Sequence, residues 1–355
     1  MTLISRSTIH DRSSENVVYN YYLPTSLLPA VPLFLYMYVR KEALLSSQIE
    51  GAQSSLSDLI LHENNAVPGA PVDDVEEVST YVAAMNFGVE RIREGQPISM
   101  RLIKEIHMIL LDSGKGSKKE PGEFRRSQNW IGGSRPGNAR FVPPPPQEVI
   151  ACMSNLEKFI HADSQLPLLV RIGLVHTQFE TIHPFLDGNG RLGRLLITLM
   201  LLAENALGEP MLYLSLYLKT HRETYYDLLQ RVRLNSDWEG WLAFFLTGLE
   251  QTADQAASTA RSLFLLLERD RQSIEQLGRP AASALRVHQY LQTNPIISVA
   301  RASESLSISK PTTGKSIDHL VDLKILEEIT GRQRDRLFVY KKYMDALAEG
   351  TEPLG

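Results

Sequence analysis

Apolar residues recur at helical spacing over most of this 355-residue chain. The first such run, LFLYMYVRKEALLSSQIEG, ends at Gly51, and a second begins near Asp73. A third follows Ser99, whose hydroxyl suits a helix N-cap. Further helical runs occupy residues 147–160, 166–182, 195–207, 221–232 and 237–277. The pattern predicts a mainly all-α fold.

A segment of different composition separates the third and fourth helical runs. Residues 113–146 are rich in Gly, Pro and charge, which disfavours a continuous helix. Within this segment the pieces QNWIGG and ARFVPP flank SRPGN. Two short strand-like pieces around a turn predict a short β-hairpin.

The pattern changes again after residues 278–280. Three short helical segments are followed by ILEEIT and RLFVYK, two β-rich pieces separated by GRQRD. Three helices and a two-stranded wing predict a winged helix-turn-helix domain. We therefore divide the chain into an N-terminal helical region (1–95), a helical core (96–250), a linking helix (251–280), the winged helix-turn-helix domain (281–345) and a tail (346–355), whose last residues, GTEPLG, we expect to be disordered.

The composition excludes some classes of protein but does not identify the function. The chain is 43% hydrophobic and 22% charged with a formal net charge of -4, which is ordinary for globular domains. Cys152 is the only cysteine, which excludes an internal disulfide and a multi-thiolate metal site. The beginning lacks the pattern of a secretory signal, and the most apolar runs, 27–39 and 195–203, are shorter than the ~20 residues that span a bilayer. We expect a cytoplasmic protein without a membrane partner.

The stretch HPFLDGNGRLGR begins at His183 and lies between two predicted helices. Gly188, Asn189 and Gly190 carry little side-chain bulk, and Asn tolerates left-handed backbone, so backbone amides can approach a ligand closely. The next helix begins there, and a helix N-terminus attracts anions. Two arginines three residues apart follow on one face of that helix, and guanidinium groups match phosphate geometry. The stretch predicts a phosphate site.

Two further side chains supply chemistry. Asp187 directly precedes the loop, where it could hold Mg2+ together with substrate phosphates. His183 closes the preceding helix and could accept a proton from an incoming hydroxyl. Together the groups favour transfer from a nucleoside polyphosphate. Each feature alone is more often a plain turn or a satisfied polar group. The Walker P-loop pattern is absent, and His176 and His183 lie roughly 10 Å apart along a helix, too far to share one zinc ion.

HPFLDGNGRLGR matches the signature HPFx[DE]GNGRxxR at every specified position, so residues 1–250 resemble the Fic family. The resemblance implies an all-helical Fic core that transfers AMP from ATP to Ser, Thr or Tyr hydroxyls of a target protein and releases pyrophosphate. It implies that His183 is the general base and Phe185 an anchor of the loop. Asp187 would bind Mg2+. The nucleotide would contact the hairpin flap at Ile131, Gly132, Gly133 and Ser134, the loop and helix start at Asp187, Gly188, Asn189, Gly190, Arg191, Leu192, Gly193 and Arg194, and the pair Tyr225 and Tyr226.

The same resemblance gives a meaning to SSQIEG at the end of the first helical run. By spacing alone, Ser46 and Glu50 are neighbours on one helix face and could be a solvated helix end. Within a Fic protein, Ser46, Glu50 and Gly51 match the inhibitory pattern [ST]xxxE[GN]. Glu50 would then pair with Arg194 and hold ATP in an unproductive pose. The expected protein is an autoinhibited adenylyltransferase.

Several alternatives stay open. The predicted winged helix carries Lys310 and Lys315 early in its recognition helix and three arginines near the wing, yet residues 281–355 hold 10 Lys and Arg against 9 Asp and Glu. DNA binding and protein docking are therefore equally open. The chain could instead be a transcription regulator with a nucleotide-sensing core, or a hydrolase that removes AMP. UTP as donor, self-modification and a homodimer through the long helix after Trp238 also stay open.

Overall fold

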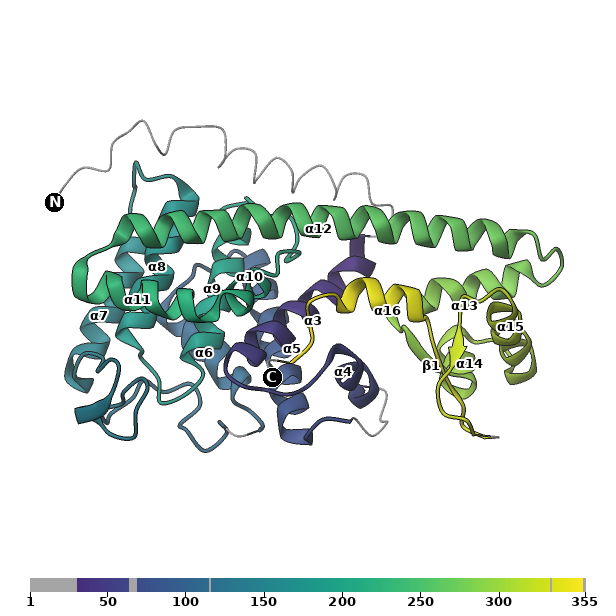
Figure 1. Cartoon of the computed structure of the whole chain (residues 1–355), viewed down its shortest axis with the longest axis horizontal. Coiled ribbons are helices and arrows are strands. Elements are labelled where there is room, and N and C mark those ends of the chain that lie inside the picture. The colour runs from purple at the N-terminus through teal and green to yellow at the C-terminus, as the bar shows by residue number, and fades with distance from the viewer. Residues whose placement is uncertain (1–30, 64–68, 115, 333, 354–355) are drawn as a thin grey trace.

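The computed structural model describes residues 31–63, 69–114, 116–332 and 334–353. The expectations for residues 1–30 lie outside the described residues. The N-terminal half contains α3 (Val31–Ile49), α4 (Leu56–Glu63), α5 (Val72–Arg93), α6 (Met100–Leu110), η1 (Pro136–Asn138), η2 (Pro146–Glu148), α7 (Val149–Ile160), α8 (Leu168–Ile182) and α9 (Asn189–Ala203) (Figure 1). It is followed by α10 (Ser215–Thr220), α11 (Arg222–Asn235), α12 (Trp238–Glu275), α13 (Ala281–Thr293), β1 (Ile296–Ser298), α14 (Val299–Leu306), α15 (Lys310–Asp322), β2 (Glu327–Glu328), β3 (Leu337–Val339) and α16 (Lys341–Ala348). The predicted helical character is confirmed.

Helix α9 lies at the centre of the N-terminal half. Nearly all of its residues are buried, as expected of a helix surrounded by others. It packs against α8, α5 and α3, while α6 packs on α5 and α7 packs on α8. The Ser99 side chain accepts a hydrogen bond from the Leu102 amide, which confirms the predicted N-cap of α6.

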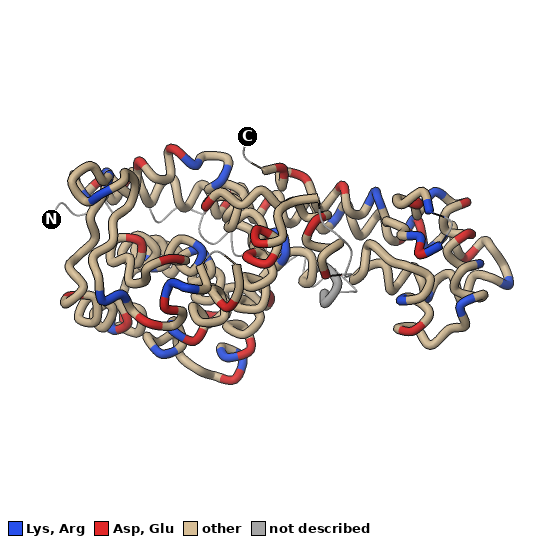
Figure 2. Tube along the Cα trace, turned by 90° about the horizontal axis from the view of Figure 1, so that it is seen from below, with Lys and Arg blue, Asp and Glu red and all other residues tan. Residues whose placement is uncertain are grey.

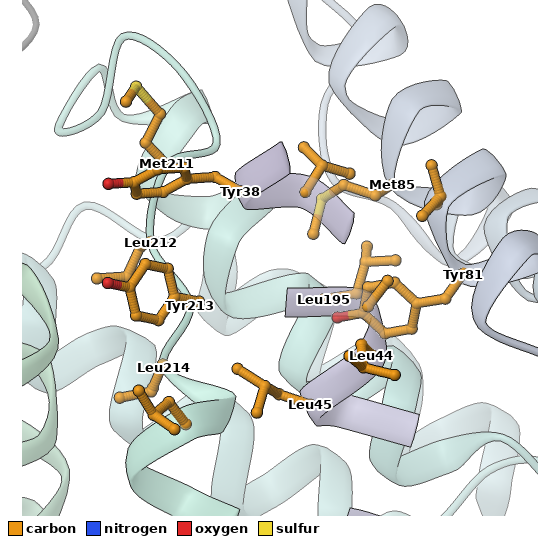
Figure 3. Close-up of a cluster of buried hydrophobic side chains, with 14 of the residues drawn as sticks. Tyr38, Leu44, Leu45, Tyr81, Met85, Leu195, Met211, Leu212, Tyr213 and Leu214 are labelled. Atoms are coloured by element: carbon orange, nitrogen blue, oxygen red, sulfur yellow. The ribbon is translucent and has the colours of Figure 1, made fainter. Parts of the chain in front are cut away.

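Helix α3 is a core element rather than a surface arm. Leu44 and Leu45 are fully buried and lie in one cluster with Leu195 of α9, Tyr81 of α5 and Leu214 (Figure 3). Helix α3 also packs against α10, α13 and α16. Both halves of the chain therefore contact this helix.

Helix α12 is unbroken across the boundary predicted at residues 250–251. Asp237 caps it by accepting a hydrogen bond from the Gly240 amide, and its 38 residues span about 57 Å. Figure 1 shows it running from the region of α8 and α11 to the C-terminal unit. Within the described residues, no helix combines the length and apolar character needed to cross a bilayer.

The C-terminal unit contains α13 to α15 and a small antiparallel sheet in the order β1-β3-β2. We predicted two strands, and the third, β1, is an addition: Ile297 pairs with Phe338 of β3. Three residues are too few to show an alternating pattern, which explains why the strand was missed. Lys, Arg, Asp and Glu are mixed over this unit rather than separated by sign (Figure 2).

The predicted hairpin is shorter than expected. One antiparallel bridge, between Ile131 and Phe141, joins its two sides. The prolines at positions 143–146 lack an amide hydrogen, so they cannot extend the ladder. Gly133 has a φ of +71° and a methyl group there would lie 2.3 Å from the Asn138 carbonyl oxygen, so this turn requires glycine.

The prediction of a disordered tail is wrong for its described part. Thr351 is buried, and its carbonyl accepts a hydrogen bond of 2.8 Å from Gln48 of α3. The C-terminus thus returns to the N-terminal half beside α3 (Figure 1). The polar composition of the tail predicted disorder. Its hydrogen-bond partner Gln48 lies 303 residues away in the chain, and local sequence does not reveal such a partner.

Candidate functional site

His183 ends α8, as predicted, and its backbone makes the turn. Its φ of +49° lies in the left-handed region, and its amide donates to the Phe179 carbonyl. Arg125 donates to the His183 carbonyl from Nε at 2.9 Å and also to the Pro144 carbonyl. These bonds hold a strained backbone turn in place. The His183 side chain stays 20% exposed, so the imidazole reaches the surface.

The surroundings of His183 favour a neutral imidazole. Burial, and then the positive charge of Arg233, lower the pKa of His183 to about 4. At neutral pH the ring therefore has a free lone pair that can accept a proton. Its Nδ1 atom lies 3.9 Å from Glu180 Oε2, which leaves Nε2 as the nitrogen away from that carboxyl group.

The loop after His183 is closed by one asparagine side chain. Asn189 Oδ1 accepts from the Phe185 amide and Asn189 Nδ2 donates to the Phe185 carbonyl, both at 2.9 Å. The left-handed backbone of the loop lies at Gly188, which has a φ of +75°. Asn189 is instead the first residue of α9. These two bonds fix the short loop that connects His183 to the N-terminus of α9.

Arg194 is buried, and its Nε and Nη2 are hydrogen-bonded to α3 and Glu50. Its Nε donates to Ser46 Oγ at 2.8 Å, and its Nη2 donates to the Ser46 carbonyl at 2.9 Å and to Glu50 Oε1 at 2.7 Å. The contact predicted between Glu50 and Arg194 is present. Burial lowers the pKa of Arg194, but the negative charge of Glu50 more than reverses this and raises it.

The Glu50 carboxylate lies directly against the start of α9. A methyl group on Gly190 would be 2.2 Å from Glu50 Oε1 and 3.0 Å from Arg194 Nη1. Burial raises the pKa of Glu50, but the Arg194 charge and hydrogen bond outweigh it, with a smaller effect of Arg191. The carboxylate is therefore ionised near neutral pH, and it occupies the position at which a helix N-terminus binds an anion.

Arg191 faces the other side of the loop. Its Nη1 is 2.8 Å from Glu77 Oε1 of α5, and its Nη2 is 3.7 Å from Asp187 Oδ1. Both arginines of the motif are thus buried and paired with carboxylates. Two cations near the same helix N-terminus can hold an anionic ligand once a carboxylate such as Glu50 leaves them.

Asp187 is the residue that could hold a divalent cation. Its side chain is 42% exposed, and Oδ1 accepts a hydrogen bond of 2.6 Å from the Gly188 amide. Among the described residues, no three His, Cys, Asp or Glu side chains come together as a metal site. A single carboxylate next to a phosphate site nevertheless suits Mg2+, which commonly binds one or two carboxylates plus substrate phosphates.

The flap residues and the tyrosine pair differ in exposure. Gly132, Gly133 and Ser134 are exposed and Ile131 is partly buried. The flap rests on α11 through an ion pair between Arg140 and Asp227.

Tyr225 points into the core, where its hydroxyl donates to His176 Nε2 at 2.9 Å, because His176 Nδ1 donates to the Gly193 carbonyl. Tyr226 is partly exposed, and the Arg222 guanidinium lies over its ring. Of the two tyrosines, Tyr226 is the one on the accessible side.

Three residues of the site were not predicted from sequence. His107 stacks on Phe185 at 3.7 Å and its Nε2 donates to the Asp187 carbonyl, since Nδ1 accepts from the Gly122 amide. Arg125 supports the His183 turn, and Glu180 is buried beside it. Only Glu180 carried a local signal, because it lies three residues before His183 on the same helix face.

Comparison with known families identifies the family of this chain. The model of the Fic/DOC family matches residues 97–201, and that of the Fic/DOC family N-terminal region matches residues 21–90. The chain belongs to the Fic/DOC family. It is 34% identical over 211 residues to "Protein adenylyltransferase Fic" of Culex quinquefasciatus and 32% identical to that of Aedes aegypti. The matched region is 58% of this chain, which spans 39% of the length of each of these relatives.

Solved structures of the family share this Fic fold. A Fic family protein from Desulfovibrio desulfuricans G20 covers 93% of this chain, and the match covers 96% of that protein, with a TM-score of 0.57 at 20% identity. Fic-1 from C. elegans, solved over residues 134–508 of its own sequence, covers 71% of this chain with a TM-score of 0.52 at 21% identity, and the match covers 72% of that structure. At these identities the similarity concerns the fold.

Proposed function

We propose that the chain is a protein adenylyltransferase that moves AMP from ATP to a hydroxyl of a protein. The observation that carries the proposal is the neutral, partly exposed imidazole of His183 beside the positive N-terminus of α9. Relatives of the core are named protein adenylyltransferases, which supports the same reaction. We assign the reaction to residues 96–250.

The reaction would use the site as follows. His183 Nε2 accepts the proton of the target hydroxyl while the hydroxyl oxygen bonds to the α-phosphorus of ATP. The bond from that phosphorus to the bridging oxygen breaks, and pyrophosphate leaves. The amides at the start of α9, with Arg191 and Arg194, stabilise the negative charge of the leaving phosphates. Tyr226 borders the nucleotide on the other side.

Mg2+ would be held by Asp187 and, when bound, would neutralise charge on the ATP phosphates. The Asp187 side chain stays partly exposed for this role, and the His107 bond to its carbonyl fixes its backbone. The flap, Ile131 to Ser134, would align the target segment by strand pairing.

The enzyme is held inactive by α3. Glu50 lies at the anion site and occupies the Arg194 guanidinium, so the terminal phosphates of ATP and the Glu50 carboxylate compete for the same place. Ser46 adds two further contacts to Arg194. Removal of the Glu50 carboxylate should free the site.

The test is intact-mass analysis of Glu50→Gly protein after incubation with Mg-ATP. We expect a gain of one AMP on the protein itself or on an added target, and none in Glu50→Gly/His183→Ala. Equal labelling of the two variants would contradict His183 as the base. A gain with UTP but not with ATP would change the donor.

A second role concerns the C-terminal unit. The order α13-β1-α14-α15-β2-β3 supports a winged helix, and Ser309 caps α15 at the N-terminus that would enter a DNA groove. We assign residues 281–345 to a winged helix that docks on DNA or protein. Salt-dependent retention of the full chain on duplex DNA would separate DNA from protein as the partner, because phosphate contacts release counterions.

A further inference from the structure

The last turn of α3 is held from two sides. Ser46 and Glu50 face Arg194, whereas Gln48, about 200° around the helix from Ser46, faces the opposite side. The Gln48 side chain is fully buried, and its Nε2 donates to the Thr351 carbonyl at 2.8 Å and to the Ser54 carbonyl at 2.9 Å. The second side of this turn is therefore formed by the C-terminal tail.

The tail itself is fixed to the helical core. Lys219 of α10 donates to the carbonyls of Gly350 and Glu352. Thr351 Oγ1 donates to the Ala348 carbonyl at 2.7 Å, and Thr351 is 3% exposed. Gly350, with a φ of +77°, lies so close to Leu216 that a methyl group would be 2.7 Å from Leu216 Cδ1. These contacts give the segment 349–352 one conformation.

A charge interaction runs between the same two elements. Lys41 of α3 is 1% exposed, and its Nζ has no hydrogen-bond partner among the described residues. Burial lowers the pKa of Lys41 to about 8, while Glu349 and Glu352 act to raise it. The tail carboxylates thus favour the charged form of a lysine buried in α3.

The burial of α3 limits how Glu50 can leave Arg194. Residues 37–49 are buried almost throughout, so withdrawal of the whole helix would expose the cluster shown in Figure 3. The end of α3 is held locally by bonds of the Glu50 amide to the Ser47 carbonyl and of the Gly51 amide to the Gln48 carbonyl, both at 3.1 Å, and by Arg222 Nε to the Ile49 carbonyl at 3.0 Å. Opening this one turn is the less costly route, and the bond between Gln48 and Thr351 opposes it.

We infer that residues 349–352 are a latch that holds the last turn of α3 closed, so that the C-terminal unit controls the pairing of Glu50 with Arg194. The inference rests on the proposed function, because it gives that pairing its regulatory meaning. A macromolecule that pulls on α16 or the tail would release Gln48, open the turn and free Arg194 for phosphate. The latch connects the unit assigned to docking with the site assigned to catalysis.

The experiment compares three full-length variants in solution. Lys219→Met loosens the tail without changing α3, and Gln48→Leu removes the donor to Thr351. Gln272→Leu is the matched control, because Gln272 is exposed on α12 and its side chain donates to Glu268 alone in the described part of the chain. The first readout is hydrogen exchange of the Glu50 and Gly51 amides, which reports opening of the turn independently of activity. The second is AMP incorporation.

Lys219→Met and Gln48→Leu should each speed exchange at both amides at least tenfold and raise AMP incorporation, while Gln272→Leu matches wild type. A chain that ends at Ala348 should behave like Lys219→Met, and a Tm measured for every variant identifies any that merely unfold. Unchanged exchange in Lys219→Met and in the shortened chain would overturn the latch.

Glu50→Gly separates this result from the proposed function. If Glu50→Gly incorporates AMP but the latch variants with fast exchange do not, the tail does not control Glu50 and the inference is overturned. If Glu50→Gly incorporates none, the proposed function fails, and the exchange rates alone still decide whether the tail holds the turn. In the Glu50→Gly background, Lys219→Met should add no further incorporation, because the carboxylate that the latch holds in place is gone.

Discussion

Glu180 Oε2 lies 3.9 Å from His183 Nδ1, and neither Glu180 Oε1 nor His183 Nδ1 has a hydrogen-bond partner in the described part of the chain. Burial raises the pKa of Glu180 to about 7. When His183 accepts a proton, its ring becomes positive next to this carboxyl group. Ionised Glu180 would stabilise the imidazolium.

Glu180→Gln should therefore slow AMP transfer. In the Glu50→Gly background we expect kcat to fall roughly tenfold, less than the about 10²-fold or more that an acid–base group itself contributes, because His183 stays in place, with KM for ATP unchanged. Glu180→Asp, which keeps a carboxyl group, should recover part of the rate. Equal rates for Glu180→Gln and the parent across pH 6 to 9 would show that Glu180 has only a packing role.

Gly190→Ala should block the site rather than activate it. The added methyl group would lie 2.2 Å from Glu50 Oε1, so it displaces the inhibitory carboxylate. The same methyl fills the space over the amides that would bind phosphate. We expect no AMP transfer by Gly190→Ala, nor by Gly190→Ala/Glu50→Gly, and at least tenfold weaker ATP binding by calorimetry. Transfer by the double variant at the Glu50→Gly rate would contradict a phosphate cradle at Gly190.

Ser46→Ala should activate partially. The Ser46 hydroxyl accepts one of the hydrogen bonds of Arg194, while the Ser46 carbonyl and Glu50 accept the others and are unchanged. One bond to a charged group contributes about 1.5 kcal/mol, so the open state should gain roughly tenfold in population. AMP incorporation should lie between wild type and Glu50→Gly. Ser47→Ala is the control: its hydroxyl is buried but has no partner among the described residues. Activation of both variants alike would indicate a general loosening of α3.

The sequence predicted local features well and long-range contacts poorly. The groups of residues 183–194 lie in one loop, so their spacing alone indicated a phosphate site next to a base. The pairing of Glu50 with Arg194 joins residues 144 positions apart, and only the family resemblance pointed to it. Arg125 was missed because its acceptors are backbone carbonyls, which leave no trace in side-chain patterns.

The C-terminal tail is a second case of a long-range contact that the sequence did not reveal. Thr351 binds Gln48 through its main chain, so neither its side-chain type nor its polar neighbours indicated burial. The segment was predicted to be disordered from composition, which measures how much apolar surface a segment can bury and not whether a distant element offers it hydrogen bonds. The sequence also left open which residue of the motif has left-handed backbone. Both Gly188 and Asn189 can adopt left-handed backbone, and the bonds from Asn189 to Phe185 decide between them.

Stability should fall as the pH decreases from about 6.5 to about 4. Burial lowers the pKa of His107, His183 and His288 to about 4 and that of His176 to about 3. Between these values and 6.5 the unfolded chain binds more protons than the folded chain, so the free energy of unfolding falls as the pH falls. Burial acts oppositely on Glu42 and Glu180, whose pKa is raised to about 7, because there the folded chain binds more protons between pH 4.5 and 7. The destabilising effect of the four histidines on acidification outweighs the stabilising effect of the two glutamates. Glu42→Gln removes one of these glutamates, so the Tm of this variant should fall more steeply than that of wild type between pH 6.5 and 4.5. A Tm that rises over this range on acidification would mean that the histidines are already charged in the folded protein.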